Sequence, residues 1–403
     1  MKPMTNGGMS PTMERIHLID SLRAIALSGV ILFNIVAMVG GFLSKELLAH
    51  AGPADMGFAA VVIFLVQGKA RACFALLFGA GFGILMERAE TRGHNFTAFY
   101  LRRMTVLLSI GLCNLTFLFF GDILILYAVL GMVMLLFRRL NNVMLIVLGL
   151  ALILLPAIGD GVTEFVTRAP LPNLSGLDPV SAGHRMAASL PAYTGHDYGA
   201  YVAANWQYYI DQWANGTTDE AVYALNVLGL FLLGLWVTRT NVLNDVEQWR
   251  PFLRRVAWIC LPIGLVLSLV HGSRRLGFAP AGPLHALVTA CYGGETIMAF
   301  GYIALAALLL TRFARPLQPA LSPMGRMALT GYLGSNAIGS FTFYGWGLGR
   351  MMNWSVTGLC LFGLSIFAGL CVFSALWMWA LRFGPAEWIW RSLTYGKLQP
   401  LKR

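Results

Sequence analysis

Several ionisable side chains stand inside stretches of this chain that are otherwise apolar, and they are its first candidates for chemistry. Asp122 and Tyr127 occur in FFGDILILYAVLGMVMLLF, residues 119–137. An ionised carboxylate inside a bilayer costs about 2.5–3.5 kcal/mol on insertion scales, so it requires a partner or a function. We therefore expect Asp122 either to cap the helix that begins after it or to belong to a catalytic pocket.

Two cations stand near the middle of the second apolar stretch. Lys69 and Arg71, in VQGKARACFALLFGAGFG, lie about twelve residues from its start, which is roughly 18 Å along a helix. Such cations suit a phosphate, a carboxylate or the pyrophosphate of an acyl donor. The alternative is a structural ion pair with Glu295, which lies in CYGGETIMAF. Gln67 and Gly68 just before the cations predict a break in the helix, where irregular backbone lines a cavity.

The first apolar stretch, RIHLIDSLRAIALSGVILFNI, also contains polar side chains, namely Asp20, Arg23 and Asn34. Asp20 and Arg23 are three residues apart, which places them on one helix face where they can pair. Arg23 is expected either to serve that pair or to anchor an anionic ligand at the cytoplasmic end. Asn34 lies about three turns further along, where a buried amide needs hydrogen-bond partners.

The elements that must position these residues follow from composition. Of 403 residues, 57% are apolar and 12% are charged, whereas soluble domains have about 25% charged residues. The apolar residues come in blocks of about 17–25, the length that crosses about 30 Å of hydrocarbon. Because the blocks are continuously apolar, we expect an all-α polytopic membrane helix bundle and not a β-barrel.

About ten membrane-spanning helices are expected. Arg and Lys favour the cytoplasmic side of membrane helices. If the chain crosses the membrane ten times, the clusters of Arg and Lys fall on one side of it, together with both termini. We therefore expect both termini in the cytoplasm. The expected spans cover residues 19–42, 57–86, 104–120, 123–137, 143–158, 221–238, 256–271, 287–311, 329–344 and 356–381.

The chain divides into one integral domain and two short ends. Residues 1–18 form a cytoplasmic N-terminal segment, residues 19–383 the helix bundle, and residues 384–403 a cytoplasmic cap. Within the cap, Glu387 and Arg391 are four residues apart and can pair across one turn of a short helix.

The longest segment outside the expected spans is an acidic outer loop, residues 159–220. Its string DYGAYVAANWQYYIDQW, residues 197–213, has apolar side chains at helical spacing and predicts an amphipathic helix at the interface. The loop is expected either to cap the bundle or to act as a lid over an outward-facing site.

Charge and cysteine content exclude some other classes. The net charge of +11 is spread over short cytoplasmic loops, where it faces anionic headgroups, so we expect no nucleic-acid partner. The six cysteines lie inside expected spans without a CxxC pair. We therefore expect neither a disulfide framework nor a metal site.

Several longer strings are specific enough for comparison with known families. The chain contains LLFGAGF, YLRRMTVLLSIGLCNLTFLFFGDILILYAVLG and RFGPAEWIWRSLTYGKLQP. Together with the first apolar stretch, these strings resemble the YeiB family of bacterial inner-membrane proteins over nearly the whole chain. The family pattern implied by the resemblance falls on Asp20, Arg23, Asn34, Lys69, Gly121, Asp122, Tyr127, Arg326, Tyr332, Pro385, Glu387, Trp390 and Arg391.

This family is similar, more distantly, to transmembrane acyltransferases, which include heparan-α-glucosaminide N-acetyltransferase. The relation implies an acyl-CoA or similar acyl donor from the cytoplasm and an acceptor reached from outside. Many members have G-x-x-H before the GDIL string, where this chain has Asn114 in GLCN. Asparagine cannot exchange a proton near neutral pH, so the protein either lacks that chemistry or uses another base. The candidates are His50, His271 and His285, and we expect Asn114 to lie near Asp122 in a polar pocket.

The sequence therefore predicts an acyltransferase-like, multi-pass protein of the bacterial inner membrane that modifies a sugar, a lipid or a small molecule. A transporter or channel for a small anionic solute is the alternative, because mid-span cations suit both, and a non-catalytic lipid-binding role is a third hypothesis. Expected partners are membrane lipids and a small-molecule or glycolipid acceptor, and a homodimer is left open.

Overall fold

The protein is helical throughout the part that its computed structural model describes, which is residues 11–40, 52–91, 95–167, 179–215, 217–273 and 294–402. Within these ranges, seven helices are long and apolar enough to cross a membrane, and the shorter apolar helices Leu124–Phe137 and Asn142–Pro156 accompany them. The prediction of a helical membrane protein is confirmed. The β-type pairing in the same ranges is a single bridge between Leu381 and Lys402.

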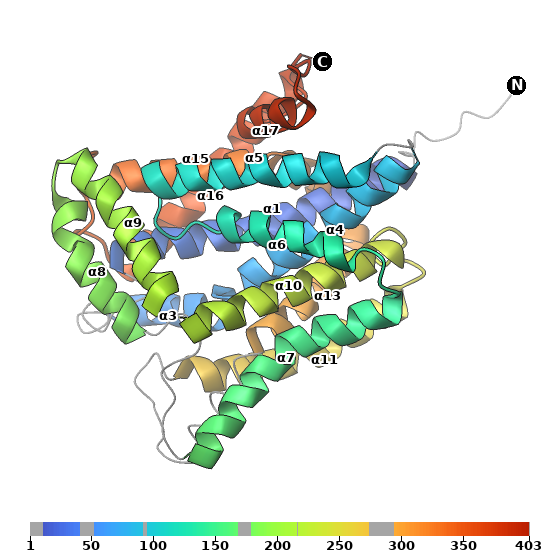
Figure 1. Cartoon of the computed structure of the whole chain (residues 1–403), viewed down its shortest axis with the longest axis horizontal. Helices are drawn as coiled ribbons and strands as arrows, with labels where there is room; N and C mark the ends of the chain where they lie inside the picture. Colours follow the sequence, from blue (N-terminus) through green and yellow to red (C-terminus); the bar gives the residue numbers. More distant parts are fainter. Residues whose placement is uncertain are drawn as a thin grey trace, which may run out of the picture.

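The long helices run side by side, with α8 and α9 stacked across one end of the row and the first turns of α1 near the other (Figure 1). In chain order the helices are α1 (Pro11–Gly40), α3 (Pro53–Val61), η1 (Val62–Val66), α4 (Lys69–Glu90), α5 (Phe96–Phe117), α6 (Leu124–Phe137), α7 (Asn142–Thr167), α8 (Pro179–Thr194), α9 (Tyr198–Asn215), α10 (Thr217–Arg239), α11 (Arg250–Ser273), α13 (Gly294–Arg312), η4 (Arg315–Leu317), α14 (Gln318–Arg326), α15 (Ala328–Phe343), α16 (Val356–Ala380) and α17 (Pro385–Tyr395).

Helix α1 is the centre of the bundle and touches α4, α13, α14, α15 and α16. Glycines make these contacts close, as is usual where membrane helices pack through small residues. A Cβ atom built on Gly325 of α14 would lie 1.7 Å from the backbone oxygen of Asp20. The two backbones are therefore in direct contact, which leaves no room for any side chain at Gly325.

The second span is broken where the sequence predicted a break. Helix α3 passes into the π-helical turn η1, and α4 begins only at Lys69. Gln67 has ψ 132° and Gly68 has φ 75°, a left-handed value that favours glycine. A Cβ atom on Gly68 would also lie 1.6 Å from Oε2 of Glu295. The break is thus the place where the Glu295 side chain of α13 comes against the backbone of the second span.

Helices α8 and α9, the cap helices, close one end of the bundle (Figure 1). The last carbonyl groups of a helix lack partners within it, and α9 side chains supply hydrogen bonds to those of α5. The three bonds run from Tyr201 Oη to Leu118 O (2.7 Å), from Tyr198 Oη to Phe117 O (3.0 Å) and from Asn205 Nδ2 to Thr116 O (3.5 Å). The predicted amphipathic helix therefore docks on the bundle through its tyrosines.

The C-terminal helix α17 is tied to the start of α15 by Glu387. Its carboxylate accepts hydrogen bonds from Leu329 N (2.7 Å), Thr330 N (3.1 Å) and Thr330 Oγ1 (2.5 Å). Burial raises the pKa of the Glu387 carboxyl, while the bonds from Thr330 and Leu329 oppose the shift. The expected pair with Arg391 is wrong, because α15 offers N–H groups without helical partners and the Arg391 guanidinium lies 4.5 Å from the Phe383 ring.

Candidate functional site

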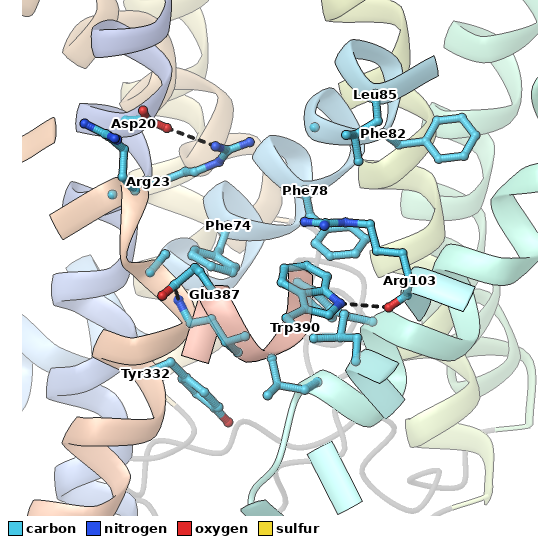
Figure 2. A pocket seen from close by; sticks show the side chains of 18 of the residues that line it. Asp20, Arg23, Phe74, Phe78, Phe82, Leu85, Arg103, Tyr332, Glu387 and Trp390 are labelled. Atoms are coloured by element: carbon cyan, nitrogen blue, oxygen red, sulfur yellow. Dashed lines mark hydrogen bonds and ion pairs between the residues drawn. The ribbon is translucent and has the colours of Figure 1, made fainter. Parts of the chain in front are cut away.

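A pocket of about 420 Å³ lies between α1, α4, α5, α6, α14, α15 and α17. We call it the arginine pocket, because six arginines line it with only two acids, Asp20 and Glu387. Apolar side chains such as Leu27, Phe74 and Phe78 form much of the remaining wall (Figure 2). The six arginines are Arg23, Arg88, Arg103, Arg326, Arg382 and Arg391.

Some of these arginines have structural partners. Arg23 pairs with Asp20 at 3.0 Å, as predicted, and both residues line the arginine pocket. The Arg103 guanidinium lies 3.6 Å from the centre of the Trp390 ring, whose Nε1 donates to Arg103 O at 2.8 Å (Figure 2). Arg326 Nη2 donates to Arg382 O at 3.3 Å. The excess positive charge of the lining suits a ligand with several anionic oxygens.

A second pocket, of about 80 Å³, lies under the cap helices and contains Asp122, and we call it the Asp122 pocket. Its charged residues are Arg71, Arg185, Asp122 and Glu220. Glu220 accepts a hydrogen bond from Gln212 Nε2 at 2.6 Å. The other lining residues are Val30, Phe33, Asn34, Ala37, Phe119, Phe120, Gly121, Ile123, Leu126, Tyr208, Tyr209, Gln212, Trp213 and Tyr223.

The two pockets meet at a thin wall. Val30 and Ile123 line both of them. Ile123 directly follows Asp122, and its N–H donates to Tyr332 Oη at 3.3 Å, while Tyr332 lines the arginine pocket. Molecules in the two pockets would therefore come closest to each other at Val30 and Ile123, beside the Asp122 carboxylate.

Asn114 lies directly against Asp122, as the sequence predicted. Asn114 Nδ2 donates to Asp122 Oδ2 at 2.6 Å, and Asn114 is 1% exposed. Asp122 Oδ1 also accepts from Ile125 N at 2.8 Å. Asp122 therefore caps the first turn of α6, as one interpretation predicted, and it also lines a pocket, whose catalytic role stays a prediction.

The amide of Asn114 continues into a chain of hydrogen bonds. Asn336 Nδ2 donates to Asn114 Oδ1 at 3.2 Å, and Asn34 Nδ2 donates to Asn336 Oδ1 at 3.2 Å. The sequence reasoning missed Asn336, although LGSNAIGS places an amide and two hydroxyls inside an apolar span. It also missed most of the cap-side lining, including Glu220 of α10, because the periodicity of a helix does not say which other helix its face meets.

The ionisation of the groups in the Asp122 pocket follows from burial. Asp122 lies in the connection between α5 and α6, and burial raises the pKa of its carboxyl to about 7, against the opposing hydrogen bonds from Ile125 and Asn114. Burial and the nearby carboxyls of Asp122 and Glu220 raise the pKa of Tyr209, on α9, to about 12. Near neutral pH, Asp122 can exchange a proton and the Tyr209 phenol stays protonated.

The mid-span cations occupy different surroundings. Arg71 lines the Asp122 pocket, and its guanidinium lies 4.7 Å from the ring centre of Tyr223 and 5.5 Å from that of Phe33. Tyr127, which lines the arginine pocket, donates its hydroxyl to Arg71 O at 3.2 Å.

Lys69, by contrast, is 1% exposed, lines neither pocket, and places Nζ 3.3 Å from Ile63 O at the helix break. Glu295 lines a third cavity of about 10 Å³ that it shares with Arg71 and Gly68. The structure thus brings Arg71 to the candidate site and leaves Lys69 and Glu295 at the break beside it.

Of the three histidines named as bases, the one that the structure describes, His271, does not line the Asp122 pocket. His271 lies near the end of α11, is 7% exposed, and lines neither pocket. His50 and His285 lie outside the described residues. Among the residues that the structure describes, no histidine lines either pocket, and no group of three His, Cys, Asp or Glu could hold a metal ion. The carboxyls that line the Asp122 pocket among the described residues are Asp122 and Glu220.

Comparison with known proteins identifies the family. The family model described as "Protein of unknown function (DUF418)" matches residues 237–397. The chain is 30% identical to the uncharacterised protein YxaH of Bacillus subtilis (strain 168) across 98% of both chains. It is 27% identical to the uncharacterised protein YeiB of Escherichia coli (strain K12), across 96% of this chain and 98% of that one. The chain, a helical membrane protein by its own structure, belongs to the YeiB-like family.

Proposed function

We propose that this protein is a membrane-bound acyltransferase that moves an acyl group from a donor in the arginine pocket to an acceptor in the Asp122 pocket. The observation that carries the proposal is the arrangement of these pockets, which meet at Val30 and Ile123 beside the Asp122 carboxyl. An acyl-CoA or similar donor fits the first pocket in chemistry, since arginines suit its phosphates and apolar walls suit its acyl end. A sugar, lipid headgroup or other small molecule with a hydroxyl or amine fits the second pocket.

The chemistry assigned to Asp122 is general-base catalysis. Its carboxylate takes the proton of the acceptor hydroxyl or amine as that atom attacks the thioester carbonyl. The new C–O or C–N bond forms, the C–S bond breaks, and the sulfur leaves with its electron pair and takes up a proton from water. Asp122 then releases its proton to water on its own side. Asn114 is placed to orient Asp122, and it does not titrate.

The proposal assigns a side of the membrane to each pocket. We infer ten passes in the inner membrane, namely the seven long apolar helices with α6, α7 and α15. The basic residues then face the cytoplasm, as does the arginine pocket. The cap helices and the Asp122 pocket face outward.

Cysteine labelling tests this orientation. In a variant without the six native cysteines, Gln207→Cys on the exposed face of α9 is expected to react with a membrane-impermeant maleimide added to intact cells. Lys397→Cys is expected to react only after the membrane is opened. Labelling of position 397 but not of position 207 in intact cells would show that the orientation is the reverse of the one proposed.

Donor binding tests the proposed function directly. Arg88 and Arg382 lie at the ends of α4 and α16 and line the arginine pocket. The double variant Arg88→Gln/Arg382→Gln is expected to weaken binding of radiolabelled acetyl-CoA to the purified protein by about tenfold or more, because charge-assisted hydrogen bonds to phosphate are lost. Arg254→Gln, an exposed arginine of α11 outside both pockets, is the control and should leave binding unchanged.

Two results would count against this assignment. Wild-type protein that binds neither acetyl-CoA nor palmitoyl-CoA would remove acyl-CoA as the donor. An equal loss of binding in the Arg254→Gln control would show that the effect comes from net charge and not from the pocket.

A transporter of a small anionic solute is the second candidate, and the broken second span favours it. Interrupted helices with charged residues at the break form substrate sites in several transporters, and here Lys69 begins α4 at such a break. Uptake of labelled acetate or phosphate into liposomes that contain the protein would support transport. Donor-dependent acylation without uptake would support the enzyme.

A further inference from the structure

Three asparagines from three helices form one line of hydrogen bonds that ends on Asp122. They are Asn34 of α1, Asn336 of α15 and Asn114 of α5, with exposures of 7%, 0% and 1%. Each donates its amide N–H to the next acceptor, at 3.2, 3.2 and 2.6 Å in that order. The base chemistry proposed for Asp122 does not need the amides of Asn34 and Asn336, so these two buried residues require another explanation.

The direction of the line is set by its last member. An ionised carboxylate can only accept hydrogen bonds, so Asn114 must turn its NH₂ group to Asp122 and its oxygen to Asn336. Asn336 must then donate to that oxygen, which turns its own oxygen to Asn34. The orientation of all three amides is therefore determined by the carboxylate at the end.

We propose that Asn336 is a positioning residue, which holds Asn114 so that the Asp122 carboxylate stays fixed toward its pocket. The proposal rests on the proposed function only in taking Asp122 as the base. Asn114 holds Oδ2 and Ile125 N–H holds Oδ1, so the rotation of the carboxylate is fixed at both oxygens. Each oxygen accepts more than one hydrogen bond, so capacity remains for the acceptor in the Asp122 pocket.

The line also links the base to the most buried part of the bundle. Asn34 lies on α1, the helix at the centre of the fold, and Asn336 on α15, while Asp122 lies in a connection between helices. A carboxylate in a connection has no rigid support of its own. Because catalytic groups must be held close to their productive geometry, support from packed helices is the expected solution.

The same line stabilises the ionised form of Asp122. Hydrogen bonds donated to a carboxylate lower its pKa, and a donor whose own oxygen accepts a hydrogen bond is a stronger donor. The charged and titratable groups that line the pocket with Asp122 are Arg71 on α4, Arg185 on α8, Tyr208 and Tyr209 on α9, and Glu220 and Tyr223 on α10, and Tyr332 on α15 lies close to Asp122. None of these is removed when Asn336 is changed.

The test is Asn336→Leu, which keeps the approximate size of the side chain and removes both of its hydrogen bonds. The pKa of Asp122 in the full-length protein is followed by infrared titration of its carboxyl band, identified by its absence in Asp122→Asn. The pKa is expected to rise by about one unit. Asn336→Gln, which keeps an amide, is expected to raise the pKa of Asp122 by less than Asn336→Leu does. Ser335→Ala is the matched control, since Ser335 is buried beside Asn336 and bonds only to Tyr332 O.

The possible results separate this proposal from the proposed function. A carboxyl shift without acyl transfer in any variant would support the positioning role and reject the enzyme. Acyl transfer in the wild type, with an unchanged carboxyl band and pH profile in Asn336→Leu, would overturn the positioning role alone. If Asn336→Leu does not fold, Asn34→Leu interrupts the line one step further away, and its smaller shift in the same direction would support the proposal, while no shift would overturn it.

Discussion

Replacing Asp122 with asparagine is expected to lower acyl transfer by about 100- to 10,000-fold, the usual contribution of a general base. The amide keeps the size of the side chain but cannot take a proton. Binding of labelled acetyl-CoA should be unchanged, because Asp122 does not line the arginine pocket. The measurement is transfer of the labelled acyl group to acceptors in a membrane extract, with donor binding measured on the same preparations.

The pH dependence of the wild type gives an independent check. The base acts in its ionised form, and the pKa of Asp122 is raised to about 7 by burial. Transfer is therefore expected to rise between about pH 6 and pH 8 and then to level off. Asp211→Asn, on the same side but outside the pocket, should behave as the wild type. Undiminished transfer by Asp122→Asn would show that another group is the base.

The second large effect is expected from Gly325→Ala. The added methyl group would overlap the backbone oxygen of Asp20, at 1.7 Å. A backbone atom cannot turn away as a flexible side chain can, so α1 and α14 must separate. Overpacking costs about 1–3 kcal/mol and occasionally more, and we expect the upper end of that range, measured as the free energy of unfolding or as a lower melting temperature in detergent.

The matched control for that variant is Gly369→Ala. A Cβ atom at Gly369 of α16 meets no atom within 4 Å, so the change should be neutral or slightly stabilising, since alanine favours helix more than glycine. Gly325→Ala should also weaken donor binding, because Asp20 and Gly325 both line the arginine pocket. A Gly325→Ala protein as stable as the wild type would mean that α1 and α14 pack less closely than described.

Features that depend on short stretches of chain could be predicted from the sequence. The apolar blocks give the helical membrane fold, and the Gln67–Gly68 pair gives the break in the second span. Asn114 and Asp122 are only eight residues apart on either side of a turn, so their contact follows from local geometry. The number of passes and the side on which each terminus lies stay predictions.

Contacts between distant helices could not be predicted in the same way. Asn336 is 222 residues from Asn114, and the periodicity of a span says which residues share a face but not which helix that face meets. Lys69 shows what depth alone does not give. Its place in the middle of the span is compatible with a ligand or an ion pair, and only the structure shows that the broken helix also offers it the carbonyl of Ile63 in the same span.

The central position of α1 has a consequence for biosynthesis. Helix α1 packs on α4 and also on α14, α15 and α16, which are made much later than α1. Until they enter the membrane, Asn336 can neither accept from Asn34 nor donate to Asn114. The arginine pocket, which residues 325–391 line in part, therefore takes shape only when the C-terminal part of the chain is inserted, whereas the residues that line the Asp122 pocket, within 30–223, are all made earlier.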